Sequence, residues 1–470
     1  MELSDHPART ARTPNEALAR LIEASGMSHH ALARRVNDLA EQAGIASSYT
    51  HTSVVNWTRR GMVPRPPIPA FIAQVLAEPL GRPVDPAEIG MAQAGQSADR
   101  VGLDFHRDVH QAVHTATRFW STVHRRTFVT SAFAVGAYST PVTRWLAVPT
   151  DADAAHRGRN RVGRQDLEAL WTAAAAAQRS DSKYGGGTRT ASTAAAFLNE
   201  RAIPLLHADC TDAVGKELFA GTAELARVAG WSALDMGHHA LAQRHFIQAL
   251  RMARAAGRLD IGCHVLTNMA LQTILRGYPD EAVDMVQGAY DRARHVAAPR
   301  VLAFAKLIEA RAHAGLGDAR SAAGALASSE QLLERADTGQ GDEPAWISYY
   351  TPARMAADAV EIHRDLGLPV AALRWNNRAT PMSTNDFTRS VGLRMTVLAT
   401  AHLQNRDLDQ ALAHGQRAVI ILSRVRSTRA TDYLAGVVRA MAPWHRDPRV
   451  IDLSRRAHQA ITFSANSVAI

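Results

Sequence analysis

The chain contains 470 residues, of which 46% are hydrophobic and 21% are charged. This length allows two or three domains, and this composition excludes a globally disordered protein. The formal net charge is +9, but residues 1–100 contain as many acidic residues as arginines, so the overall charge does not by itself indicate a nucleic-acid-binding protein.

Neither a signal peptide nor a membrane span is predicted. The N-terminal run MELSDHPARTARTP has no apolar core, and the most apolar window, Thr127–Val142, is too short and too polar to cross a bilayer. Cys210 and Cys263 have no metal-ligand spacing and fit a reducing compartment. We therefore expect a cytoplasmic protein without a membrane partner.

Four short helices are predicted near the N-terminus, after a segment over residues 1–14 that is expected to be disordered. Gly26 ends the first helix, Ser28 caps the second, and Gly61 ends the third, because such residues favour helix ends. The expected helices cover residues 15–25, 28–40, 52–60 and 70–80. Their lengths and order suit a small helix-turn-helix domain over residues 15–82.

The third helix is the candidate DNA-reading helix. Val54 and Trp57 are three residues apart and would anchor it to the core, which leaves polar side chains on the outer face. Asn and Arg match the edges of adenine and guanine, whereas Ser and Thr suit phosphates. The candidate DNA-binding residues are His51, Thr52, Ser53, Asn56, Arg59, Arg60 and Arg65. The alternative is a four-helix module without a nucleic-acid partner.

The run SHHALARRV…HTSVVNWTRRGMVPRPP resembles the lambda-repressor-like (XRE-type) DNA-binding domains. This resemblance implies that the third helix enters the major groove of double-stranded DNA. The connection between the second and third helices is longer than the tight turn that is usual in that family.

Residues 83–100 are rich in small and polar residues and are predicted to form a linker. A helical connecting region over residues 101–220 follows, in which His106, His110 and His114 are four residues apart on one helical face. Such a stripe could bind a metal ion. Because few acidic residues and no cysteine lie nearby, we expect packed or solvated histidines and no metal site.

Two other stretches of the connecting region suggest a ligand at first sight. The basic loop 157–164 contains Arg157, Arg159, Arg161 and Arg164, and is either an exposed loop or a contact to the DNA backbone. Gly185–Gly187 lack the preceding strand and the Gly-Lys-Ser/Thr ending of a phosphate loop. They are expected to form a hinge between helices.

From residue 221 onward one pattern recurs: a turn residue, an alanine five positions later, and a second small residue seven positions beyond. The turn residues are Gly237, Gly277, Gly317, Gly367 and Arg406. They lie about 40 residues apart, except across the polar insert Asp337–Pro344, and such a period is typical of helical solenoids. The pattern predicts an all-α chain with a solenoid of helical hairpins over residues 221–465, similar to tetratricopeptide repeats.

The first helix of each hairpin would line the concave face of such a solenoid. The candidate groove residues are Arg227, Trp231, His264, Thr267, Asn268, Arg311, Arg354 and Glu361. Because Asn can pair with a peptide backbone and Arg with a carboxylate, the expected ligand is a signalling peptide or an acidic small molecule. The alternative occupants are a helix of another protein and this chain's own DNA-binding domain.

Together, the run WTRRG…PRPP and the run GWSALDMGHHALAQRHFIQALRMA resemble one family of actinobacterial regulators. These are cytoplasmic proteins with an N-terminal helix-turn-helix and C-terminal tetratricopeptide repeats, and they include negative regulators of sporulation and antibiotic production. The resemblance implies a transcriptional regulator. Because helix-turn-helix proteins commonly read two half-sites, it also suggests a homodimer.

No enzymatic activity and no cofactor are predicted. The sequence lacks a metalloprotease helix motif, a nucleophile elbow and a pair of carboxylates in a context that would raise a pKa. The alternative to regulation is a non-enzymatic scaffold that binds other proteins through the groove of the repeats.

Overall fold

The computed structural model describes residues 13–42, 47–64, 68–80, 84, 88–91, 100–122, 132–149, 151, 154–156, 158, 160–187, 189–339, 342–379 and 382–468. All regular elements among these residues are helices, which confirms the all-α prediction. The chain divides into two compact units, Met1–Arg100 and Val101–Ile470. The segment that was expected to be disordered lies almost entirely outside the described residues.

The first unit is a bundle of short helices. They are α1 (Glu16–Ser25), α2 (His29–Gln42), α3 (His51–Arg59) and α4 (Ile68–Leu80). Gly26 ends α1 with a φ of 65°, as its position predicts, and the Ser28 hydroxyl accepts a hydrogen bond from the N–H of Ala31 at the start of α2. Val54 and Trp57 anchor α3 to the core, where they are 0% and 4% exposed.

The bundle extends beyond its predicted end at residue 82. Val84, Ile89 and Met91 are buried in the same core as the helices, and the Asn15 side chain donates a hydrogen bond to the Ile89 carbonyl at 2.7 Å. The predicted linker over 83–100 therefore begins too early. Its few apolar residues, which are spaced too irregularly to indicate a helix, close the bundle.

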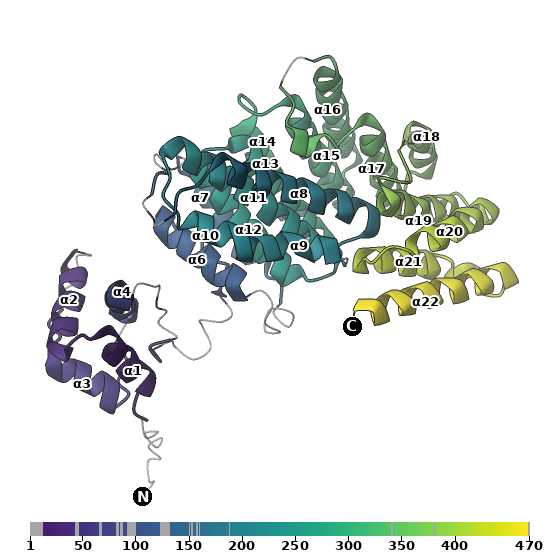
Figure 1. Ribbon diagram of the computed structural model, residues 1–470. Coiled ribbons are helices and arrows are strands. Elements are labelled where there is room, and N and C mark those ends of the chain that lie inside the picture. The colour runs from purple at the N-terminus through teal and green to yellow at the C-terminus, as the bar shows by residue number, and fades with distance from the viewer. Residues whose placement is uncertain are drawn as a thin grey trace, which may run out of the picture. The chain divides into compact units, whose positions relative to one another are not determined.

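The second unit contains a solenoid of helical hairpins, whose paired helices follow one another in Figure 1. The pairs are α11 (Asp212–Asp235) with α12 (His239–Ala255), α13 (Leu259–Leu275) with α14 (Pro279–Ala293), α15 (Pro299–Gly315) with α16 (Ala319–Asp337), α17 (Pro352–Asp365) with α18 (Pro369–Ala379), α19 (Thr388–Gln404) with α20 (Leu408–Leu422), and α21 (Thr428–Ala440) with α22 (Pro448–Val468). This architecture confirms the predicted solenoid.

The turns within the hairpins explain the recurring pattern. Gly237, Gly277, Gly317 and Gly367 have φ values of 76°, 85°, 75° and 69°, and Arg406 adopts the same left-handed conformation with a φ of 56°. The small residues that follow the turns are 0% exposed: Ala242, Ala249, Ala282, Ala289, Ala322, Ser329, Ala372, Ala379, Ala411 and Ala418. Their size allows the paired helices to approach each other closely.

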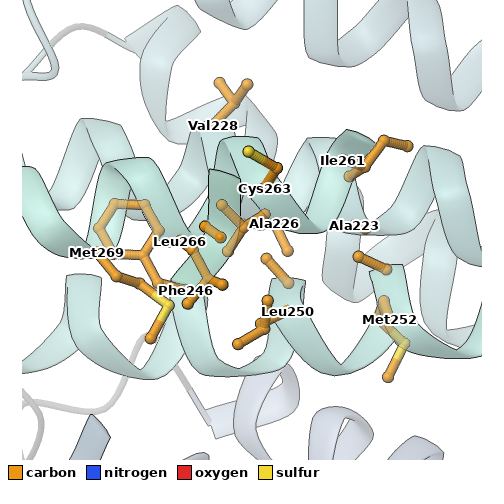
Figure 2. Close-up of a cluster of buried hydrophobic side chains, with 14 of the residues drawn as sticks. Ala223, Ala226, Val228, Phe246, Leu250, Met252, Ile261, Cys263, Leu266 and Met269 are labelled. Atoms are coloured by element: carbon orange, nitrogen blue, oxygen red, sulfur yellow. The ribbon is translucent and has the colours of Figure 1, made fainter. Parts of the chain in front are cut away.

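Figure 2 shows the core at the start of the solenoid. Phe246 and Leu250 of α12 belong to one buried cluster with Ala226 of α11 and Leu266 of α13. Gly230 permits this packing, since a methyl group built on it would overlap the Phe246 ring. Large side chains thus fill the space that small residues leave between the helices.

The last hairpin lacks the turn signal of the others. Its helices, α21 and α22, are joined by the 3-10 turn η5 (Ala442–Trp444) instead of a turn glycine. Its apolar residues Leu434, Val437 and Leu453 are nevertheless buried together with residues of α19 and α20. Packing, rather than a repeated turn, makes this hairpin part of the solenoid.

The region over 101–220 packs onto the solenoid and shares its core. Its elements are α6 (Val109–Thr122), η2 (Val135–Tyr138), α7 (Ser139–Ala147), α8 (Arg164–Tyr184), α9 (Arg189–Phe197), the π-helical turn η3 (Leu198–Ala202) and α10 (Ile203–Leu206). Phe119, Trp120 and Trp145 are buried in the cluster that also contains residues of α11 to α17. None of the described helices combines the length and the apolar character that crossing a membrane requires.

Candidate functional site

The outer face of α3 carries the candidate DNA-binding residues of the first unit. His51, Thr52, Arg59 and Arg60 are exposed, while Ser53 and Asn56 are half-buried. Among the described residues neither Arg59 nor Arg60 is ion-paired. Ser53 also accepts a hydrogen bond from the Thr50 N–H at 3.1 Å, so it caps the helix as well. The remaining candidate, Arg65, lies outside the described residues.

Asn37 of α2 holds the long connection that leads into α3. Its side-chain amide donates to the Tyr49 carbonyl at 2.8 Å, and its side-chain oxygen accepts from the Tyr49 N–H and the Ser47 hydroxyl, both at 2.9 Å. The Tyr49 ring packs edge-on against Trp57, with 5.1 Å between ring centroids. The start of α3 is therefore fixed relative to α2, although the connection is no tight turn.

His29 joins this face, although the sequence interpretation did not include it. Its ring centroid lies 5.3 Å from that of His51, and its pKa is lowered by burial and by the neighbouring charges of His51 and Arg59. The only sequence signal was its place at the start of α2, where helix N–H groups favour an anion. The start of α2 and the outer face of α3 thus lie side by side.

In the second unit, the predicted groove residues lie on the first helices of the hairpins but do not line an open groove. Arg227, His264, Thr267 and Asn268 are at most 3% exposed, and Glu361 is 9% exposed. This arrangement differs from the open concave face that the sequence predicts. The reason is that other parts of the same chain cover these side chains.

The covering contacts begin at α11 and α13. Arg227 pairs with Glu224 at 2.7 Å and donates to Gln178 of α8 at 3.0 Å. His264 stacks on Trp346 with 5.0 Å between ring centroids, and burial together with Arg227 holds its pKa well below the usual value. The hydroxyl of Thr267 and the amide of Asn268 donate to carbonyls of their own helix.

Farther along, the charges on the inner helices neutralise one another. Arg311 pairs with Asp358 at 2.9 Å and with Glu361 at 3.0 Å, and Arg354 pairs with Asp358 at 2.7 Å. The Tyr433 hydroxyl donates to Glu361. The remaining space among these side chains is about 30 Å³, which suits a water molecule and no peptide. This part of the predicted groove is therefore a buried ionic network.

A second ionic cluster joins helix α8 to the first helices of three hairpins, α11, α19 and α21. Asp181 of α8 pairs with Arg389 of α19 at 2.7 Å and accepts from the indole of Trp231 at 2.8 Å. Asp235 of α11 also pairs with Arg389, at 3.0 Å, and with Arg429 of α21 at 3.3 Å. Residues from the beginning and the end of the solenoid thus meet around one helix.

The Gly185–Gly187 run allows this approach. The Gly186 N–H donates to Asp235 at 2.9 Å, and the Gly187 N–H donates to the Arg426 carbonyl at 3.1 Å. Methyl groups built on Gly185 and Gly186 would overlap backbone carbonyl oxygens of Arg426 and Ser232. The predicted hinge is thus a close contact between two backbones that only glycine permits.

The histidine stripe is only partly helical. Helix α6 begins at Val109, so His106 lies before it, whereas His110 and His114 border a cavity of about 470 Å³ with His156 and His207. Within the described residues, no group of three or more His, Cys, Asp or Glu side chains could hold a metal ion.

Of the predicted basic loop, only part falls within the described residues. Arg164 begins α8 and pairs with Glu168 at 2.8 Å, and the described part also includes Arg161. Arg157 and Arg159 lie outside the described residues. The proposed contact of this loop with the DNA backbone therefore stays a prediction.

Comparison with known proteins finds a similarity for the first unit. No curated protein matches the chain. Residues 18–92 match the family described as the SP15 N-terminal domain. The match begins at Leu18 and ends beside Met91, which are the first and the last buried core residues in the described part of the bundle.

Proposed function

We propose that this protein is a sequence-specific DNA-binding transcriptional regulator of the cytoplasm. In this proposal the first unit is a helix-turn-helix domain of the XRE type, and the second unit, with its tetratricopeptide-like hairpins, senses a ligand or joins two copies into a homodimer. The observation that carries the proposal is the outer face of α3, where Arg59 and Arg60 are exposed and not ion-paired among the described residues.

The side chains of this face divide into two roles. Asn56 and Arg60 are one helical turn apart and suit base edges, since the donor and acceptor of an Asn amide match adenine and the paired donors of Arg match guanine. His29 and His51 gather at the starts of two helices, where they suit phosphates. The resemblance to actinobacterial regulators extends the proposal to the control of development or secondary metabolism.

The scaffold alternative has less support. A scaffold of this kind needs an accessible groove along the first helices of the hairpins. The side chains of that face are instead engaged by α8 and by each other, as in the pairs Asp181–Arg389 and Arg311–Asp358. A protein partner would have to displace these buried ion pairs before it could bind there.

The test is recovery of genomic DNA fragments bound by the full-length protein, followed by a salt titration on the best fragment. We expect a near-palindromic site whose half-sites are about 34 Å apart, with an affinity that falls steeply with salt.

Arg59→Ala/Arg60→Ala should weaken binding at least tenfold and reduce the salt slope by about 1 for each lost phosphate contact. The matched control Arg455→Ala/Arg456→Ala removes the same charge from α22 and should bind normally. Equal losses in both double variants, or no enriched fragment, would reject the proposal.

A further inference from the structure

A large cavity lies within the second unit, between α8, the segment Pro344–Tyr349 and the start of α19. Its volume is about 1010 Å³, which is at the upper end of the range of about 300–1,000 Å³ for small-molecule sites. The predicted groove residues are not among those that line it. It is therefore a separate candidate site.

The aromatic walls of the cavity are held in place by contacts behind them. Trp171 donates its indole N–H to Glu217 at 3.0 Å. Trp346 stacks on the buried His264, whose Nε2 lies 3.0 Å from the Tyr349 hydroxyl. Fixed aromatic walls favour a flat apolar ligand, because little side-chain freedom is lost on binding.

Two polar residues of the lining, Gln178 and Glu224, are already hydrogen-bonded within the protein. Gln178 accepts from Arg227 at 3.0 Å and donates to the Trp346 carbonyl at 3.4 Å. Both carboxylate oxygens of Glu224 accept from Arg227, at 2.7 and 2.8 Å. These two side chains are therefore not available to the amide groups of a peptide, whereas an apolar body needs no such partners.

Positive charge without an acidic partner lies along the α8 edge. Arg179 and Lys183 are one helical turn apart, border the cavity and form no ion pair among the described residues. Arg258, by contrast, is paired with Asp260 at 2.7 Å, and Asp386 lies on the edge formed by the start of α19. We propose that the cavity binds a small molecule with a flat apolar body and one acid group, which lies at Arg179 and Lys183.

This inference rests on the proposed sensing role of the second unit and adds the chemical class of the ligand. Helix α8 carries one wall of the cavity, including Arg179 and Lys183, and also Asp181, which pairs with Arg389 of α19. A ligand that contacts α8 in its docked position therefore stabilises that position over any other. The cavity lining and the Asp181–Arg389 contact lie on the same helix.

The test uses full-length protein with two fluorescent probes, 1-pyrenebutanoate and 1-pyrenebutanol, which share a flat body and differ in the acid group. We expect one molecule of the acid per chain, with energy transfer from tryptophan to pyrene. The acid should bind about fivefold to tenfold more tightly than the alcohol.

Arg179→Ala/Lys183→Ala should remove this preference and leave the affinity for the alcohol unchanged. The control Arg455→Ala/Arg456→Ala should change neither affinity.

A second variant places the binding inside the cavity. Ala175 is exposed on α8 and borders the cavity, so Ala175→Trp should narrow the cavity and weaken binding of both probes, with an unchanged far-UV circular dichroism spectrum. Unchanged affinity of both probes for Ala175→Trp, equal affinity of the wild-type protein for the two probes, or no saturable binding would each overturn the proposal. Because no DNA is used, probe binding without DNA binding would reject only the regulator proposal.

Discussion

Arginine has different roles in the two units. In the first unit, Arg59 and Arg60 point outward from α3 and are not ion-paired among the described residues. In the second unit, Arg227, Arg311 and Arg389 have side chains that are 4%, 9% and 3% exposed, and each is paired with carboxylates. The overall basic charge therefore does not locate a nucleic-acid surface. The burial and pairing of each arginine distinguish the two groups.

The ion pairs of the two units differ in the same way. Arg35 and Glu78 of the first unit pair with side chains that are 40% and 69% exposed, where solvent screens the charges. Asp235 of the second unit is 0% exposed and contacts Arg389, Arg429 and the Gly186 N–H. Removal of Asp235 takes away the carboxylate partner of Arg429 and one of the two carboxylate partners of Arg389.

The largest expected effect follows from this difference. Asp235→Ala should lower the free energy of unfolding of the second unit by about 3–5 kcal/mol, whereas Glu78→Ala should cost the first unit at most about 1 kcal/mol. Urea unfolding of the full-length variants measures the loss, and hydrogen exchange of peptides from α11 and α2 assigns it to a unit. Similar losses in the two variants would contradict the contrast between the units.

A glycine substitution tests the docking of α8 without removing a charge. Gly186→Ala places a methyl group against the Ser232 carbonyl, so it should destabilise the second unit by about 1–3 kcal/mol and increase hydrogen exchange in α8. Gly324→Ala is the control, because Gly324 lies inside α16 with open space around it. That change should be neutral or stabilise by up to about 1 kcal/mol. Unchanged exchange in α8 of Gly186→Ala would show that this contact is dispensable.

Low pH should reduce the free energy of unfolding of the second unit through a buried histidine. Burial lowers the pKa of His245 in α12 to about 3, below its unfolded value of 6.5, so the unfolded chain binds the extra proton as pH falls from 6.5 towards 3. At pH 5 this residue alone should reduce the stability of the second unit by about 2 kcal/mol relative to pH 7.

Urea unfolding at pH 5 and pH 7 measures this loss. His245→Gln should reduce the pH dependence by that amount, while His458→Gln, on the exposed face of α22, should not. An unchanged pH dependence in His245→Gln would place the acid sensitivity at other groups, such as His239 or His414, whose pKa values are lowered to about 4.

The features that could be predicted from sequence are those with a local cause. Gly26 and Gly237 mark helix ends because only glycine enters the left-handed region at little cost. The spacing of three residues between Val54 and Trp57 identifies the buried face of α3. The docking of α8 has no such signal. Asp181 and Arg389 are far apart in sequence, and a charged residue on an inner helix looks the same whether it lines a groove or closes one.

The smallest expected effect concerns the connection before α3, which departs most from the resemblance in sequence. Asn37→Ala removes three hydrogen bonds to Tyr49 and Ser47 and should destabilise the first unit by about 1–2 kcal/mol. Because these bonds fix the start of α3, DNA affinity should fall as well.

Thermal unfolding and DNA titration of this variant are compared with Asp38→Ala, an exposed neighbour on α2. If stability falls and DNA affinity does not, the connection supports the bundle without positioning α3 on DNA. If both fall together at a temperature where the bundle stays folded, the long connection performs the task of the tight turn that it replaces.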